Sequence, residues 1–355
     1  MIVTTALSLS PGPWAALTLG LFVIGAVLST GALTLADYMK RLDPNDRVAR
    51  IIELLLQTNQ ILEDVPWLEG NLLTGHRTTV RTGLPQVFWR LLNQGIPTSK
   101  SHTAQIDEQT GMLEAYSQVD KDLAELGGNV NAVRLSEARP FIEAMNQELA
   151  STVFYGTAGS PEEFIGLAPR YSALAGAGNS DNVINATGSG ADNTSVWLIA
   201  WDEETLCGIF PKGSTAGIFH EDLGLETVEN AGGVPGKLMR AYRDHWQWKA
   251  GVAVKDWRYA VRICNIDVSN LGGGSAADLV TLMQDAEERL PNELGRRAFY
   301  MNRLIRRTLR HQAHTEVKAG GGLTYENIGG RRVTMFGTTP VRITDALLNA
   351  EAAVA

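Results

Sequence analysis

A regular apolar stripe marks residues 132–156 as the clearest single element of the chain. Its large apolar side chains recur at every fourth position: Phe141, Met145, Leu149 and Val153. This spacing is that of one face of an amphipathic helix. Ser136 is a candidate N-cap, Pro140 then falls in the first turn, and Gly156 is a candidate stop. The pattern predicts one helix over 136–154, roughly 27 Å long.

Before this helix, polar residues alternate with β-branched ones in three runs, 77–82, 101–106 and 112–119, as expected for strands. Glycine and proline interrupt the chain between the first two runs. The result is a long ribbon, Arg77 to Val119, with large apolar residues near its tip: Leu84, Phe88, Trp89, Leu91 and Ile96. A two-stranded ribbon has no core of its own, so these residues need a surface. The sequence alone leaves open whether that surface belongs to the same subunit or to a neighbour.

Further along the chain, apolar runs predict short buried strands at Ser195–Trp201 and Thr205–Phe210. Aromatic residues then alternate with polar ones over Asp244–Ile266, which predicts two adjacent strands that pack on the long helix. The other expected elements are helices at Asp37–Leu62, Ser275–Leu290 and Phe299–Gln312, a loop at Trp67–Gly75 and a final strand at Arg332–Ile343.

Composition describes a soluble globular chain of 355 residues with 44% hydrophobic and 20% charged residues. Two domains are the ordinary expectation at this length. The net charge of −8 argues against a general nucleic-acid binder, which would normally be basic. Cys207 and Cys264 are the only cysteines, and we expect both to be reduced and buried.

The N-terminal segment is unusual because Met1 to Ala36 contains no charged side chain and 14–28 is almost continuously apolar. A signal peptide would carry Lys or Arg ahead of its apolar core, and a membrane-spanning helix needs about 20 apolar residues. Three interpretations stay open: a leader absent from the mature protein, an arm that packs on neighbours, or a membrane anchor.

Several blocks in order resemble the major capsid proteins of tailed bacteriophages with the Hong Kong 97 fold, in particular those of short-tailed phages. The blocks are LTLADYMKRLDPN from Leu33, WLEGNLLTGHRTTVRTGLP from Trp67, LSEARPFIEAMNQELASTVFYG from Leu135, LAPRYSAL from Leu167, IFPKGSTAG from Ile209, DWRYAVRICNID from Asp256 and FGTTPVRITDALLNAE from Phe336. They run from about Leu33 to the C-terminus and leave the apolar extension 1–33 outside the resemblance.

The resemblance implies an α+β fold with four parts. These are an N-terminal arm at 34–71, an extended β-hairpin loop at 72–120, a peripheral domain at 121–175 and 236–268 with its spine helix at 136–154, and an axial domain at 176–235 and 269–345. It also implies that the ribbon docks on a neighbouring subunit.

The function implied by the resemblance is structural, namely a major capsid protein that self-assembles through hexamers and pentamers into an icosahedral shell around double-stranded DNA. Implied partners are other copies of the chain, scaffolding, portal and decoration proteins, and packaged DNA bound without sequence specificity. The location is the virion, with assembly in the host bacterial cytoplasm. No cofactor, metal, membrane or enzymatic activity is implied. Two alternatives are a cellular encapsulating shell of the same fold and a membrane-tethered enzyme that uses His220 or His245.

Few other patterns carry chemistry. Arg303, Arg306 and Arg310 share one face of the helix expected there, which can meet DNA phosphates, acidic residues of a neighbour, or only solvent. The Gly272–Gly274 run before a helix lacks the Lys-Ser/Thr ending of a phosphate loop. His311, His314 and Glu316 are a weak metal candidate, and 220–222 is expected on a loop. The resemblance also raises cross-linking between subunits through a lysine of the extended loop, for which Lys100 is the one candidate, without an evident catalytic acid.

Overall fold

Strand β9, Leu238–Val254, is the longest strand of the described residues and belongs to two packing units. The computed structural model describes residues 33, 37, 56–126, 128–229, 235–272, 276–291, 294–316, 323–328 and 331–355. The apolar extension, most of the expected Asp37–Leu62 helix and residues 273–275 lie outside them. Of the described residues of that expected helix, Asp37 is helical, residues 56–60 are not, and Ile61–Asp64 forms a short helix, α2.

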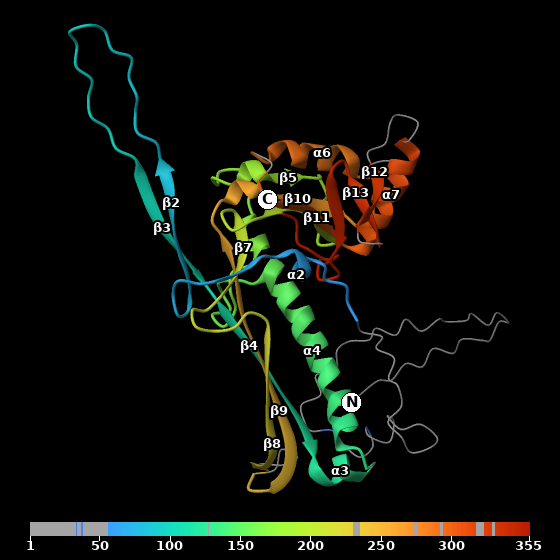
Figure 1. Cartoon of the computed structure of the whole chain (residues 1–355). Helices are drawn as coiled ribbons and strands as arrows, with labels where there is room; N and C mark the ends of the chain where they lie inside the picture. Colours follow the sequence, from blue (N-terminus) through green and yellow to red (C-terminus); the bar gives the residue numbers. More distant parts are fainter. Residues whose placement is uncertain are drawn as a thin grey trace, which may run out of the picture.

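The first unit, which we call the helix-backed sheet, consists of β8, β9 and β4 with helix α4 against it (Figure 1). Strand β4, Gly111–Asp120, pairs with β9 from Gly111↔Ala250 to Asp120↔Ala241. Strand β8, Ile218–Glu229, pairs with the other edge of β9. Two expectations were therefore wrong. Residues 112–119, expected in the ribbon, pair with β9 in this sheet, and residues 220–222, expected on a loop, lie on strand β8.

Helix α4 spans Val130–Tyr155 and is six residues longer at its start than the apolar pattern predicts. The side chain of Asn129 caps it by accepting a hydrogen bond from the Ala132 amide at 3.1 Å. Ser136 lies inside the helix and donates its hydroxyl to the Val133 carbonyl. The expected stripe is largely confirmed: Met145, Leu149 and Val153 are buried. Trp246 of β9 packs against Met145 and Ala138, as the aromatic pattern predicts.

The second unit, the central sheet, holds β6 (Asn193–Trp201) between β10 (Ala260–Asp267) and β11 (Arg296–Met301). The remaining elements of this unit are β1 Trp67–Glu69, β5 Val183–Asn185, β7 Leu206–Phe210, β12 Leu323–Ile328, β13 Arg331–Phe336, β14 Thr339–Ile343, α6 Leu279–Arg289 and α7 Arg303–Glu316. Short helices are α3 Lys121–Leu126, α5 Leu167–Arg170, η1 Ser180–Asn182 and η3 Trp257–Tyr259.

Four boundaries differ from expectation because buried strands pair in ways that spacing does not show. Strands β9 and β10 are not neighbours: β10 pairs with β5 and β6. Phe299–Met301 belongs to β11, and α7 begins only after Asn302, whose side chain accepts a hydrogen bond from the Ile305 amide. The final strand is a hairpin that turns at Gly337. The expected loop at 67–75 contains β1, which pairs with β7.

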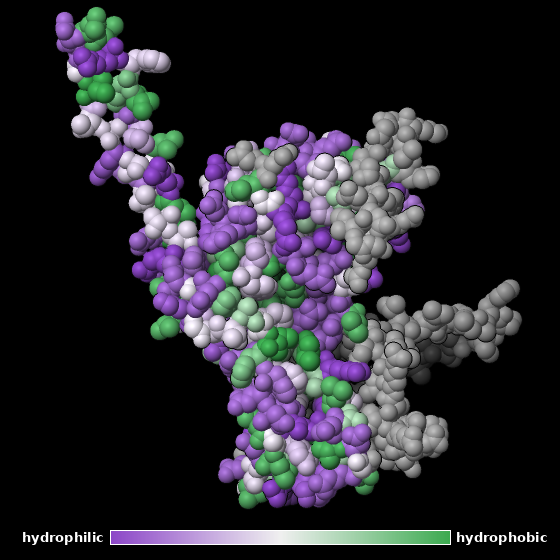
Figure 2. Space-filling model, viewed as in Figure 1, coloured by the Kyte–Doolittle hydropathy of each residue, from purple (hydrophilic) through white to green (hydrophobic). Residues whose placement is uncertain are grey.

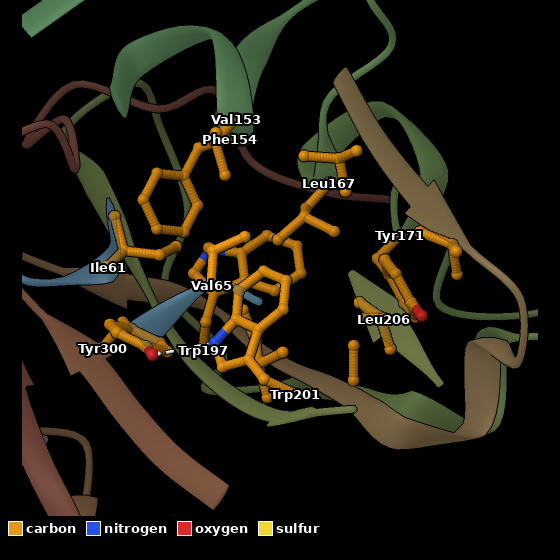
Figure 3. Close-up of a cluster of buried hydrophobic side chains, with 14 of the residues drawn as sticks. Ile61, Val65, Val153, Phe154, Leu167, Tyr171, Trp197, Trp201, Leu206 and Tyr300 are labelled. Atoms are coloured by element: carbon orange, nitrogen blue, oxygen red, sulfur yellow. Dashed lines mark hydrogen bonds between the residues drawn. The ribbon is translucent and has the colours of Figure 1, made fainter. Parts of the chain in front are cut away.

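Both faces of β6 are buried, as its apolar run predicts. Trp197 and Ile199 face a cluster with Phe154 of α4, whereas Val196 and Leu198 face α6 and α7 on the other side. Figure 3 shows the first cluster, in which the Trp201 indole N–H donates to the Tyr300 hydroxyl at 2.8 Å. Aromatic residues from helix and sheet therefore fix the end of α4 on the central sheet.

The C-terminal segment is fixed across this sheet by a buried ion pair that the sequence did not suggest. Glu351 accepts hydrogen bonds from Arg262 at 2.9 Å, from Ser195 at 2.5 Å and from Tyr155, the last residue of α4, at 2.5 Å. Both charged side chains are almost completely buried. One carboxylate therefore joins the C-terminal segment, the central sheet and the helix.

Cys207 and Cys264 are buried and unpaired, as expected. Burial raises the pKa of the Cys264 thiol to about 11, so it stays protonated and unreactive near neutral pH. Within the ranges that the structure describes, no helix is both long and apolar enough to cross a membrane.

We predict that Glu351→Ala lowers the free energy of unfolding by about 3–5 kcal/mol, because it leaves the Arg262 guanidinium buried without its counter-charge. Urea denaturation of unassembled subunits measures this. Arg258→Ala, which breaks the exposed pair with Asp256, is the matched control and should change stability much less. Equal effects of the two substitutions would contradict a structural role for the buried pair.

Candidate assembly surface

The ribbon is a separate two-stranded sheet of β2, Gly75–Gly83, and β3, His102–Gln109. The strands pair antiparallel from Gly75↔Gln109 to Gly83↔His102, with a register shift after Arg81. Figure 1 shows the ribbon extending away from the body, with residues 84–101 as an open loop at its end. The first two of the three predicted ribbon strands are therefore confirmed.

The end of the ribbon exposes a concentration of apolar side chains. Trp89 is fully exposed, Val87 is 90% exposed and Phe88 44%. Also exposed are Leu84, Leu91, Leu92 and Ile96. The space-filling view shows apolar residues gathered there (Figure 2). The alternative of a flap folded over its own domain is therefore wrong for the isolated subunit. A contiguous exposed patch of this kind marks an interaction site.

The foot of the ribbon is fixed to the body by a bidentate ion pair. Arg170, at the end of α5, donates to both carboxylate oxygens of Glu108 in β3 at 2.6 Å. Glu108 is buried. Gly75 permits the close approach of the strands here, because a Cβ would lie 2.1 Å from the Glu108 carbonyl oxygen. The foot of the ribbon, around Gly75 and Glu108, is therefore held against the body, whereas the loop at its tip is not.

Two further contacts hold the start of the ribbon. The side-chain amide of Asn71 bonds both backbone groups of Arg77, at 2.7 and 2.8 Å. The Arg77 side chain crosses to Asp107 on the facing strand at 2.6 Å. This hydrogen bond lowers the pKa of the Asp107 carboxyl, so the pair persists under mildly acidic conditions. Both partners are exposed, and the pair contributes little to stability.

The basic face of α7 is partly occupied within the subunit. Arg303 binds Asp345 through two nitrogens at 2.8 Å each and also donates to Thr58. The hydrogen bond with Asp345 raises the pKa of the Arg303 guanidinium. Arg306 and Arg310 make further contacts of their own. The sequence missed this role of Arg303 because Asp345 lies far along the chain.

The two histidines proposed for an enzyme lie on the paired strands β8 and β9, where His220 is opposite Trp246 and His245 is opposite Glu221. His220 is 3.1 Å from Asp244 and stacks on Trp246, and His245 stacks on Tyr116. Arg134 of α4 binds Asp244 at 2.7 Å. His220 therefore belongs to the network that fastens α4 to the helix-backed sheet, whereas His245 contacts Tyr116 and Glu114 of β4.

Other candidates are placed as follows. Lys100 is exposed beside the tip. The side chains of His314 and Glu316 and residues 273–275 lie outside the described residues. In the described part of the chain, no group of three or more His, Cys, Asp or Glu side chains is arranged to hold a metal ion.

The sequence model of the family described as major capsid protein GP7 matches residues 43–355. The chain belongs to this family of major capsid proteins. Among solved structures, a protein chain in the structure of bacteriophage Epsilon15 is 32% identical in sequence to this chain. The two superpose with a TM-score of 0.74, and the match covers 93% of this chain and 99% of the Epsilon15 chain. The bacteriophage JBD30 capsid is 8% identical, with a TM-score of 0.45 over 83% of this chain and 92% of that chain, and carries no weight by itself. A comparison with curated protein sequences finds no match.

Family membership and this similarity bear out the fold and function that the sequence suggested. The chain has the α+β Hong Kong 97 fold, and it is a structural protein of the bacteriophage head shell. The two alternatives, a cellular shell and a tethered enzyme, are not favoured. Sequence reasoning found the apolar tip of this capsid protein but missed Glu108 and Arg170, which are 62 residues apart.

We predict that Glu108→Ala speeds hydrogen exchange of the β2 and β3 amides near the foot about tenfold or more in free subunits, because a charged hydrogen bond worth roughly 1.5–3 kcal/mol is lost. Mass spectrometry of exchanged peptides measures this. Asp107→Ala, which removes the exposed neighbouring pair, should have a much smaller effect. Unchanged exchange in the first variant would mean that the pair does not fix the ribbon.

Proposed function

We propose that this capsid protein builds its shell from hexamers and pentamers in which each ribbon docks on a neighbouring subunit. The observation that carries the proposal is the exposure of Phe88 and Trp89 at the end of a ribbon anchored only at its foot. Burying a large side chain contributes roughly 1.5–3 kcal/mol. Repeated at every contact of a closed shell, this contribution favours assembly without changing the subunit.

We further propose the division of labour that the family resemblance implies. The arm at 34–71 and the ribbon within 72–120 make contacts between subunits, while the peripheral and axial domains form the body. Arg306 and Arg310 contact packaged double-stranded DNA or a neighbour. Scaffolding, portal and decoration proteins are the expected partners, and assembly in the host bacterial cytoplasm precedes DNA packaging. The acidic balance of the chain supports weak, sequence-independent contact with DNA, since few phosphates would be neutralised.

We predict that replacing Leu84–Ile96 by a short Gly-Asn turn yields a folded subunit that does not form shells. The deleted segment contributes no residue to the buried clusters of the body, so circular dichroism and thermal melting should stay close to those of the unaltered chain. Sedimentation should show free subunits or capsomers in place of particles. Normal particles would refute docking in trans, and an unfolded subunit would place the tip in the subunit's own core.

A further inference from the structure

A small apolar pocket opens between the C-terminal half of α4, the start of β4 and the segment 162–164. Its volume is about 270 Å³. The apolar lining comes from Met112, Leu113, Leu149, Phe164 and Trp248. Met112 is exposed, while Leu149 and Phe164 are buried and fixed in the core. The pocket is thus preformed, with one adaptable side chain at its mouth.

Three carboxylates, Glu148, Glu162 and Glu163, stand around this pocket. Glu148 and Glu162 are exposed and Glu163 is half-buried. Across the described residues, none of the three side chains forms an ion pair. An apolar floor with an unneutralised acidic rim fits an aromatic or aliphatic anchor that carries a positive charge beside it.

The ribbon has this combination of properties. From Glu69 to Asp107 the sequence has no acidic residue in between, and it has four basic ones: Arg77, Arg81, Arg90 and Lys100. Trp89 is fully exposed and directly precedes Arg90. In a chain of net charge −8, such a stretch is electrostatically complementary to the acidic rim.

The subunit cannot fill this pocket with its own tip. The pocket borders Gly111, two residues after β3 ends, so it lies at the foot of the ribbon. Strand β3 has eight residues, and at about 3.3 Å per residue the tip begins on the order of 25 Å away. Folding back would break the β2–β3 pairing. The occupant must therefore come from another molecule.

A second, larger cleft at the foot of the ribbon is a weaker candidate. It has a volume of about 1640 Å³ and is lined by both signs of charge, Glu203 and Glu204 against Lys255 and Arg258. A cleft this wide would not enclose a single aromatic side chain, and its mixed charge would not favour a basic residue over an acidic one. The smaller pocket satisfies both requirements.

We propose that the pocket bordered by Glu148, Glu162 and Glu163 receives Trp89 of a neighbouring copy of the chain, with Arg90 of that copy beside the carboxylates. The proposal rests on the docking of ribbons in trans and adds the receptor site. Trp89 provides the buried area, and Arg90 sets the orientation through charge.

Charge reversal with rescue tests the electrostatic part. Arg90→Glu should reduce particle yield about tenfold or more, since it places like charges together. Glu162→Lys with Glu163→Lys should do the same. All three changes in one chain should restore most of the yield. The matched control pairs the two lysine substitutions with Lys212→Glu, an exposed residue outside the pocket, and should not restore it. Absence of rescue would overturn the assignment of Arg90.

A cysteine pair tests the contact itself. Val87→Cys with Met112→Cys, which leaves Trp89 in place, should give, on mild oxidation of assembled particles, a ladder of covalent oligomers on a non-reducing gel. Native Cys207 and Cys264 are buried and should not contribute. Val87→Cys with Leu135→Cys, exposed toward the other end of α4, is the control and should give no ladder.

The outcomes separate the two levels of the account. If the variant lacking 84–96 forms no shells and the pocket pair gives no ladder, the ribbon docks elsewhere and the pocket assignment is wrong. If that variant forms normal shells, docking in trans itself fails, and this proposal fails with it. A ladder from the pocket pair and none from the control pair would support both docking in trans and the pocket assignment.

Discussion

A two-stranded ribbon has two faces and no interior, so large apolar side chains at its end have nothing within the subunit to pack against. In this chain the ribbon is fixed at one end only, where Arg170 holds Glu108, and seven large apolar residues stand at the other end in contact with water. The free subunit is therefore folded but carries an unsatisfied surface. If the ribbon docks on a neighbour as proposed, assembly into a shell removes that surface from water and gains the hydrophobic free energy of its burial.

The body must stay rigid for such an arm to act as a connector. Three devices provide this rigidity: the aromatic cluster around Trp197, the network of Arg134 with Asp244, and the buried pair of Arg262 with Glu351. Each joins segments distant in sequence, and the last joins the C-terminal segment to the end of α4. In the proposed assembly, a neighbour that binds the ribbon of one subunit is therefore connected to a fixed body.

Local periodicity predicted the elements whose burial is one-sided or complete. The stripe of α4, the buried run of β6 and the alternation in β2 and β3 were all readable, as was the exposed tip around Trp89. Pairing between distant strands was not readable: nothing in Met112–Val119 distinguishes a partner in β3 from one in β9. The same reason hid β11, since the apolar run ending at Met301 suits a buried strand and a helix equally. Asn129 was passed over as a cap because the apolar stripe begins later than the helix.

Ion pairs between remote residues were also beyond the sequence. Glu108 and Glu351 look like ordinary surface acids until the chain folds, and only then do their arginine partners come within hydrogen-bond distance. Such residues determine where the ribbon stands and how the body is closed, although no local motif marks them. The proposal that the ribbon docks on a neighbouring subunit comes from the family resemblance, since periodicity left the docking surface open.

Trypsin cleavage of the ribbon, in free subunits and in assembled shells, tests the central claim most directly. The exposed basic residues of the outer ribbon, Arg81, Arg90 and Lys100, are the cleavage sites. If the ribbon docks on a neighbour, cleavage should be rapid in free subunits and strongly suppressed in shells, with fragment masses that identify each site. Equal cleavage rates after Arg90 in both states would contradict the account, because a docked tip cannot remain accessible to the protease.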